Sequence, residues 1–151
     1  MQIFDMLSCV YSDALTEVVS TVAGIRLKVV SRESDKEFND IIGVMILNGD
    51  ESGILSVSAN KPDARILCAN IIGISPADVT EDDMDDTMCE LVNMTAGNSK
   101  LRLSDSSYMF TLSQPFVIKG KDVSIVTKNI TNVIASTLSD GEITVKIKAI
   151  Y

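Results

Sequence analysis

The segment from Thr80 to Gly97 constrains the fold more than any other part of this sequence, because its residues separate onto two faces of a helix. At about 100° per residue, the core-facing side takes a set of mainly apolar residues: Met84, Met88, Leu91, Val92 and Thr95. The opposite side carries four small or polar residues: Asp86, Glu90, Asn93 and Gly97. A helix with one apolar stripe has to bury that stripe against another layer. The segment therefore predicts a long helix packed on other secondary structure.

The start of this helix is marked by Thr80 and Asp83, which have the spacing of a capping box. The acidic run over residues 81–86 suits the positive end of a helix dipole. We interpret that run as capping and solvation rather than as a metal site. The other end is less constrained, because the helix either stops at Gly97 or continues towards Leu103.

A second helix of the same design is predicted over residues 3–23. Three of its residues repeat the spacing of Asp86, Glu90 and Gly97 at a constant offset of 73 residues: Asp13, Glu17 and Gly24. Such a repeat indicates an internally duplicated fold, with halves of about 1–73 and 74–151. Two amphipathic helices packed on one sheet would, however, share part of this pattern without any duplication.

The first helix is degenerate as a functional site. Ser20 stands where the second helix has Asn93, and a hydroxyl lacks the reach and the two-sided hydrogen bonding of a carboxamide. At the same offset, Ile42 stands where the second half has Pro115. We therefore expect one active helix rather than two.

Between and after the helices, several segments alternate apolar and polar residues or are rich in β-branched residues, which is typical of strands. The predicted strands are Ile25–Ser31, Ile41–Leu47, Ile54–Ala59, Tyr108–Leu112, Val123–Lys128, Val133–Leu138 and Glu142–Ile150. A further helix opens near Pro62 and ends at Gly73. Each half thus reads as a helix followed by strands. The expected fold is a single α+β domain over residues 1–151, a two-layer arrangement of one antiparallel sheet with long helices packed on one face.

Composition excludes several classes of function. The chain has a net charge of −8 and scattered basic residues, which speaks against binding nucleic acid or an anionic membrane. It contains no His, so His-based zinc sites and Ser-His-Asp triads are excluded. Cys9, Cys68 and Cys89 are predicted to be small buried hydrophobes in a reduced compartment. With no signal-like start and no apolar run of about 20 residues, a cytoplasmic protein is expected.

The polar face of the second helix matches a known motif. Asp86, Glu90 and Asn93 are followed by Pro115, and Gly97-Asn98-x-Lys100 lies just behind them. This pattern resembles that of the CheC/CheX/FliY family of chemotaxis phosphatases. The lone active helix is more similar to CheX than to CheC, which has two. The resemblance implies a CheC-like fold with internal pseudo-two-fold symmetry.

The resemblance also implies a substrate and residue roles. The substrate would be the phospho-aspartate of a CheY-type response regulator, which itself binds the Mg²⁺, so that this chain needs no metal or other cofactor. Glu90 would dock on the regulator's lysine and Asn93 would enter its active site. A carboxamide can hold an attacking water, as a Gln does in GTPases. Asp86 and Asn98 would support partner binding, and Gly97 would allow close backbone approach.

Three alternatives stay open at this level. Glu90 and Asn93 alone could be ordinary exposed polar residues of a helix, and Pro115 either shapes a loop beside the site or simply ends a strand. The domain could also be a non-catalytic docking module that binds a receiver or a flagellar-switch protein.

The family resemblance further implies a homodimer formed through sheet edges, for which the strand Glu142–Ile150 is the candidate.

Overall fold

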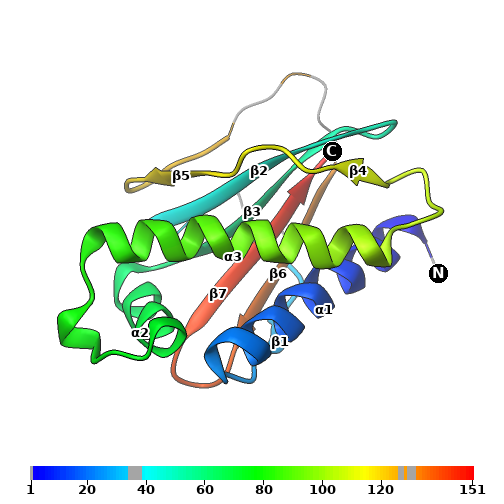
Figure 1. The fold of residues 1–151 in the computed structure, drawn as a ribbon. Coiled ribbons are helices and arrows are strands. Elements are labelled where there is room, and N and C mark those ends of the chain that lie inside the picture. The colour runs from blue at the N-terminus through cyan, green and yellow to red at the C-terminus, as the bar shows by residue number, and fades with distance from the viewer. Residues whose placement is uncertain (1, 34–38, 126–127, 129–131) are drawn as a thin grey trace.

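The computed structural model describes residues 2–33, 39–125, 128 and 132–151. Three helices and seven strands follow one another in this part of the chain (Figure 1). The order is α1 (Ile3–Ala23), β1 (Lys28–Ser31), β2 (Ile41–Gly49), β3 (Gly53–Ala59), α2 (Lys61–Ile72), a 3₁₀ turn (Pro76–Asp78), α3 (Glu81–Arg102), β4 (Phe110–Thr111), β5 (Phe116–Lys119), β6 (Val133–Ser139) and β7 (Thr144–Ile150).

The strands form one antiparallel sheet in the order β1-β6-β7-β3-β2-β4, and β5 also pairs with β2. The three helices lie together on one face of that sheet (Figure 1). This arrangement confirms the predicted two-layer α+β fold. It also has the form that a duplicated unit would give, because β3 and β7 pair at the centre and β2 and β6 flank them. The division into halves near residue 73 stays a prediction.

The core lies between the helices and the sheet. The predicted stripe of α3 is confirmed: Met84, Met88, Leu91, Val92 and Thr95 are each at most 1% exposed. These residues meet alternate side chains of the central strands, which point towards the helix layer: Met45, Leu47, Leu55, Val57, Val145 and Ile147. The core is therefore mainly aliphatic, in keeping with the low aromatic content of the sequence, and it includes two buried aromatic residues, Tyr11 and Phe110.

The start of α3 and the end of α1 each have a local cause in the sequence. The Thr80 hydroxyl accepts from the Asp83 backbone N–H at 3.1 Å, and the Asp83 carboxylate accepts from the Thr80 N–H at 3.0 Å. This is the predicted capping box. α3 then continues past Gly97 to Arg102. α1 ends at Gly24, whose φ of 67° lies in the left-handed region that glycine adopts without strain.

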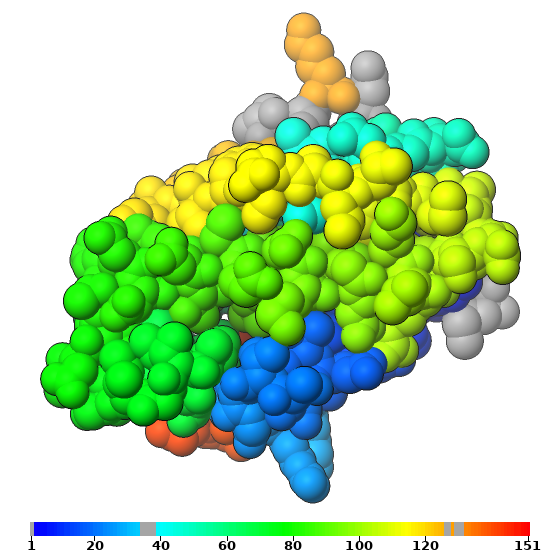
Figure 2. Space-filling model, in the orientation of Figure 1, coloured from blue at the N-terminus to red at the C-terminus, as the bar shows by residue number. Residues whose placement is uncertain are grey.

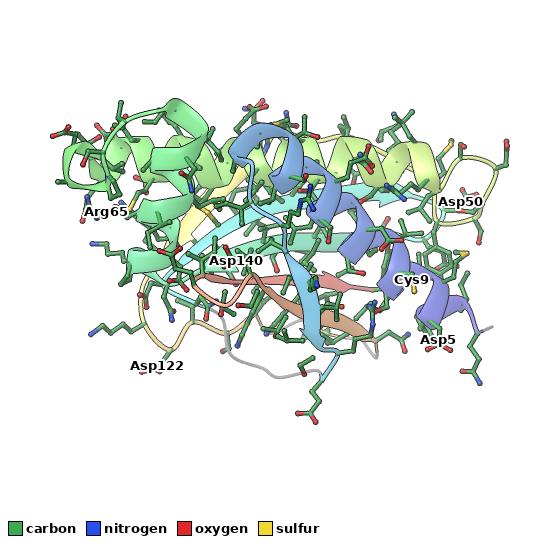
Figure 3. The ribbon with its side chains drawn as sticks, turned by 90° about the horizontal axis from the view of Figure 1, so that it is seen from below. Asp5, Cys9, Asp50, Arg65, Asp122 and Asp140 are labelled. Carbon is green, nitrogen blue, oxygen red and sulfur yellow. The ribbon has the colours of Figure 1, made fainter. Side chains whose placement is uncertain are left out.

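Three sequence expectations need correction. β7 lies between β3 and β6 and is paired on both sides, so it is not a free edge for dimerisation; a homodimer through another edge stays a prediction. Residues 123–125 of the expected strand Val123–Lys128 are not in a strand, and residues 126 and 127 lie outside the described residues. The strand β5 (Phe116–Lys119) was not predicted. Of the three cysteines expected to be buried, only Cys68 is: Cys9 is exposed on α1 (Figure 3), and Cys89 is half-buried on α3. Ile42, which stands at the position where the first half lacks the proline, is the buried second residue of β2.

No helix in the described part of the chain is both long and apolar enough to cross a membrane.

Candidate functional site

The polar face of α3 forms the front of the helix layer. α3 crosses the molecule between the connection from β4 to β5 on one side and α1 with α2 on the other (Figure 1). Asp86 and Glu90 are exposed there, and Asn93 and Gly97 are half-buried one and two turns further along. The helix therefore presents these residues as a ridge, while its other side is held in the core.

A hollow lies beside this ridge, between α3 and the β4–β5 connection. We call it the α3–β5 hollow. Its residues are Asp86, Cys89, Glu90 and Asn93 from α3 and Ser113, Gln114 and Pro115 from the connection. Four residues predicted from the sequence are thus brought together in one place: Asp86, Glu90, Asn93 and Pro115. Pro115 belongs to the wall of the hollow and directly precedes β5, as the interpretation of a loop-shaping proline requires.

Two side-chain contacts hold the β4–β5 connection and β5 in place, in addition to the pairing of β5 with β2. The Ser113 hydroxyl donates to the Ile46 carbonyl of β2 at 2.7 Å. At the end of β5, the Lys119 ammonium donates to the Asp85 carboxylate of α3 at 3.0 Å. This contact, more than any other, raises the pKa of Lys119. Pro115 is therefore fixed between two anchored points, and the wall of the hollow is defined by both the sheet and α3.

The floor beneath the ridge depends on a glycine that the sequence analysis did not single out. A Cβ atom added to Gly43, the third residue of β2, would lie 2.4 Å from the Met88 carbonyl oxygen and 3.2 Å from the Val92 Cβ. Only a residue without a side chain lets α3 approach the strand this closely. Met88 lies between Asp86 and Glu90 in the helix, so this contact sets the height of the site above the sheet.

Gly97 and Asn98, which follow Asn93, differ in their surroundings. A Cβ atom on Gly97 would meet nothing within 4 Å. Packing within the chain therefore does not require a glycine at this position. The Asn98 amide nitrogen donates to the Glu17 carboxylate of α1 at 3.2 Å, and its carbonyl oxygen accepts from Arg102 Nε at 2.7 Å. Asn98 thus lies outside the hollow and connects α1 to α3.

The first helix holds its corresponding residues in a different environment. Asp13 and Ser20 are exposed, while Glu17 forms an ion pair with Arg102 of α3. The hydrogen bond from Asn98 and the guanidinium of Arg102 hold the pKa of Glu17 below its ordinary value. The carboxylate that corresponds to Glu90 in the repeat is thereby used in a contact between two helices.

Cys89 is the one thiol in the hollow, and its electrostatic environment makes it a poor nucleophile. Burial, and then the neighbouring carboxylates Glu90 and Asp86, raise its pKa, so the thiol form dominates at neutral pH. Within the residues that the structure describes, no three metal-ligating side chains gather in one place. The polar groups of the hollow are therefore the carboxylates of Asp86 and Glu90, the carboxamides of Asn93 and Gln114, and the Ser113 hydroxyl.

Sequence reasoning missed the other residues of this site for identifiable reasons. Ser113 and Gln114 carry no pattern of their own, and only their position next to Pro115 could have drawn attention to them. Gly43 carries a usable signal, because an isolated glycine inside an apolar strand often marks the close approach of another backbone.

Comparison with known proteins gives consistent matches. The family model described as chemotaxis phosphatase CheX matches residues 41–138, more than half of the chain. A chemotaxis protein CheX from Desulfovibrio desulfuricans is 25% identical, with a TM-score of 0.81 over 95% of this chain and 97% of that one. A CheC-like superfamily protein from Shewanella sp. PV-4 is 26% identical, with a TM-score of 0.83 over 99% and 98%.

One further solved structure is a complex. It contains CheX, CheY, BeF₃ and Mg²⁺ from Borrelia burgdorferi, and its matching chain is 18% identical to this one, with a TM-score of 0.76 over 93% of this chain and 95% of that one. At that identity the likeness shows the fold. No curated protein matches the sequence.

Proposed function

The chain belongs to the CheX family of chemotaxis phosphatases, and from that premise we propose that it hydrolyses the aspartyl phosphate of a CheY-type response regulator. The observation that carries this proposal is the α3–β5 hollow. There, Glu90 and Asn93 lie next to Pro115 on an exposed surface that a protein partner can reach. A CheY-type partner would also place the chain in the cytoplasm.

Asn93 is the proposed water-orienting residue. Its amide oxygen can accept a hydrogen bond from a water molecule, while its amide nitrogen donates to a phosphoryl oxygen. The water oxygen would then attack phosphorus in line with the bond to the aspartate, that bond breaks, and the products are inorganic phosphate and the free carboxylate. An acyl phosphate is reactive enough that positioning supplies much of the acceleration. The elevated pKa of Cys89 fits a mechanism without a thiol nucleophile.

Glu90 is the proposed docking residue. It is exposed one turn before Asn93 on the same face of α3, where its carboxylate can pair with a lysine of the regulator and fix the register of the two proteins. Asp86 adds negative charge at the rim of the same hollow. The Mg²⁺ would come with the regulator and neutralise the phosphoryl oxygens.

The test is phosphate release from a Mg²⁺-loaded, phosphorylated CheY-type receiver. We expect wild-type protein to accelerate release and Asn93→Ala to lower kcat by roughly a hundredfold, the scale seen when one positioned hydrogen-bonding group is removed. Glu90→Ala should mainly raise KM. Asn70→Ala, which removes an exposed carboxamide from α2, is the matched control and should leave both constants unchanged. Binding without acceleration would favour the docking module instead, and an absence of both would refute the assignment.

A further inference from the structure

A second depression lies on the other flank of the α3 ridge, where α1, α2 and α3 meet. Its apolar lining is Val22 from α1, Ile71 and Ile72 from α2, and Leu91 and Met94 from α3. In Figure 2 the surface is hollowed where the green of α2, the blue of α1 and the lighter green of α3 come together. We call this depression the three-helix groove. Ile72 is 48% exposed there, so a large apolar side chain stands open to solvent.

The rim of the three-helix groove is acidic. Asp83, Asp86 and Glu90 border it along α3, and within the described residues no Lys or Arg lines it. Asp86 and Glu90 border the α3–β5 hollow as well. The two carboxylates therefore stand on a ridge with the hollow on one side and the apolar groove on the other, and any protein that reaches both of them covers the start of the groove.

We propose that the three-helix groove is a second docking site for the same receiver partner, and that it takes a large apolar side chain adjacent to a Lys or Arg on the receiver's surface. This role rests on the proposed function, because it is the receiver bound at Glu90 and Asn93 that would overhang the groove. An apolar side chain buried among Val22, Ile72 and Met94 would supply affinity. The neighbouring Lys or Arg of the receiver would pair with the acidic rim and fix the orientation of the bound receiver.

The charge distribution selects this occupant over two others. A second copy of the chain would bring its own acidic rim against Asp83 and Asp86, and the whole chain carries a net charge of −8. An anionic lipid surface would be repelled for the same reason. A basic patch with an apolar centre on the receiver has the complementary character.

The experiment distinguishes receiver binding at the groove from catalysis at the hollow by measuring KM and kcat separately. We expect Ile72→Ser to raise KM for the phosphorylated receiver about tenfold and to leave kcat unchanged, since the groove touches no reacting atom. Ile72→Leu should restore the wild-type KM. Leu101→Ser, which removes a 78% exposed apolar residue of α3 outside the groove and the hollow, is the matched control and should behave as wild type.

Titration with a receiver loaded with Mg²⁺ and beryllofluoride gives a second measurement that needs no turnover. If wild type binds this receiver and Ile72→Ser binds it with unchanged affinity, the groove assignment is wrong, whatever the phosphatase result. If wild type binds but does not accelerate phosphate release, the proposed phosphatase activity fails while a weaker Ile72→Ser complex still supports the groove. If wild type does not bind, both assignments fall.

Discussion

Gly43 of β2 and Met88 of α3 are in such close contact that a methyl group on the glycine would lie 2.4 Å from the Met88 carbonyl oxygen. The contact joins β2 to the turn of α3 that carries Asp86 and Glu90. It explains how the ridge is held at a fixed height beside the wall formed by Pro115. A glycine that does not itself line the hollow thus contributes to the geometry of the site.

Substituting Gly43→Ala should therefore destabilise the protein and impair the site together. The added methyl group meets backbone atoms, which can only make room if α3 shifts, and overpacking of this kind costs roughly 1–3 kcal/mol. Urea unfolding measures the loss of stability, and the rate of receiver dephosphorylation, the proposed activity, measures the impairment of the site. A Gly43→Ala protein as stable and as active as wild type would show that α3 is free to adjust at this point.

The contact between Glu17 and Arg102 predicts a dependence of stability on pH. The pKa of Glu17 is lowered in the folded protein, chiefly by Asn98 and then by Arg102. Its stabilising contribution is therefore present above the ordinary glutamate value of about 4.5 and is lost as the pH falls through the lower folded value. The melting temperature of Glu17→Gln should be slightly below that of wild type at pH 7, and the two should converge in acid.

Exposed ion pairs are weak and screened by salt, so the same difference should shrink at 1 M NaCl. Glu51→Gln changes an exposed glutamate of the β2–β3 hairpin and serves as the control. An effect of Glu17→Gln that is as large in acid as at neutral pH would mean that the side chain acts through packing instead.

The three cysteines should react with alkylating reagents in a defined order. Cys9 is exposed and should react first. Cys89 is half-buried with a raised pKa, and Cys68 is fully buried, where burial again raises its pKa and the Thr87 hydroxyl donates to its sulfur at 3.0 Å. Thiolate fraction and access both control the rate, so Cys68 should be labelled only on unfolding. Mass spectrometry of peptides from protein alkylated in the native state measures the order, and early labelling of Cys68 would contradict this packing.

Signals within short stretches of the sequence predicted most of the fold. Thr80 and Asp83 fixed the start of α3 through hydrogen bonds within four residues, and Gly24 fixed the end of α1 through its own backbone conformation. The apolar stripe from Met84 to Thr95 fixed which face is buried. Such features are readable from sequence because cause and effect lie within one or two turns.

Features that depend on distant partners were not readable in this way. The interior position of β7 follows from pairing with β3, about 90 residues earlier in the chain, and no pattern within the strand distinguishes a centre from an edge. The exposure of Cys9 depends on which side of α1 packs against the sheet. The use of Glu17 as a partner of Arg102 requires two helices to meet. Even so, the helix periodicity put Asp86, Glu90 and Asn93 on one face, and the structure brings Pro115, which the family motif adds to them, into the same hollow. The roles of these residues stay predictions.

Gly97 gives the sharpest contrast with Gly43, since the same substitution should have the opposite effect on stability. A Cβ atom at Gly97 meets nothing within 4 Å, and replacing a glycine inside a helix by alanine stabilises it by roughly 0.5–1 kcal/mol. Gly97→Ala should therefore unfold at a higher urea concentration than wild type. If the polar face of α3 is where the receiver docks, the added methyl group should weaken receiver binding at the same time. A variant that is more stable but binds the phosphorylated receiver less tightly would show that the glycine is kept for the partner, and unchanged binding would place Gly97 outside the interface.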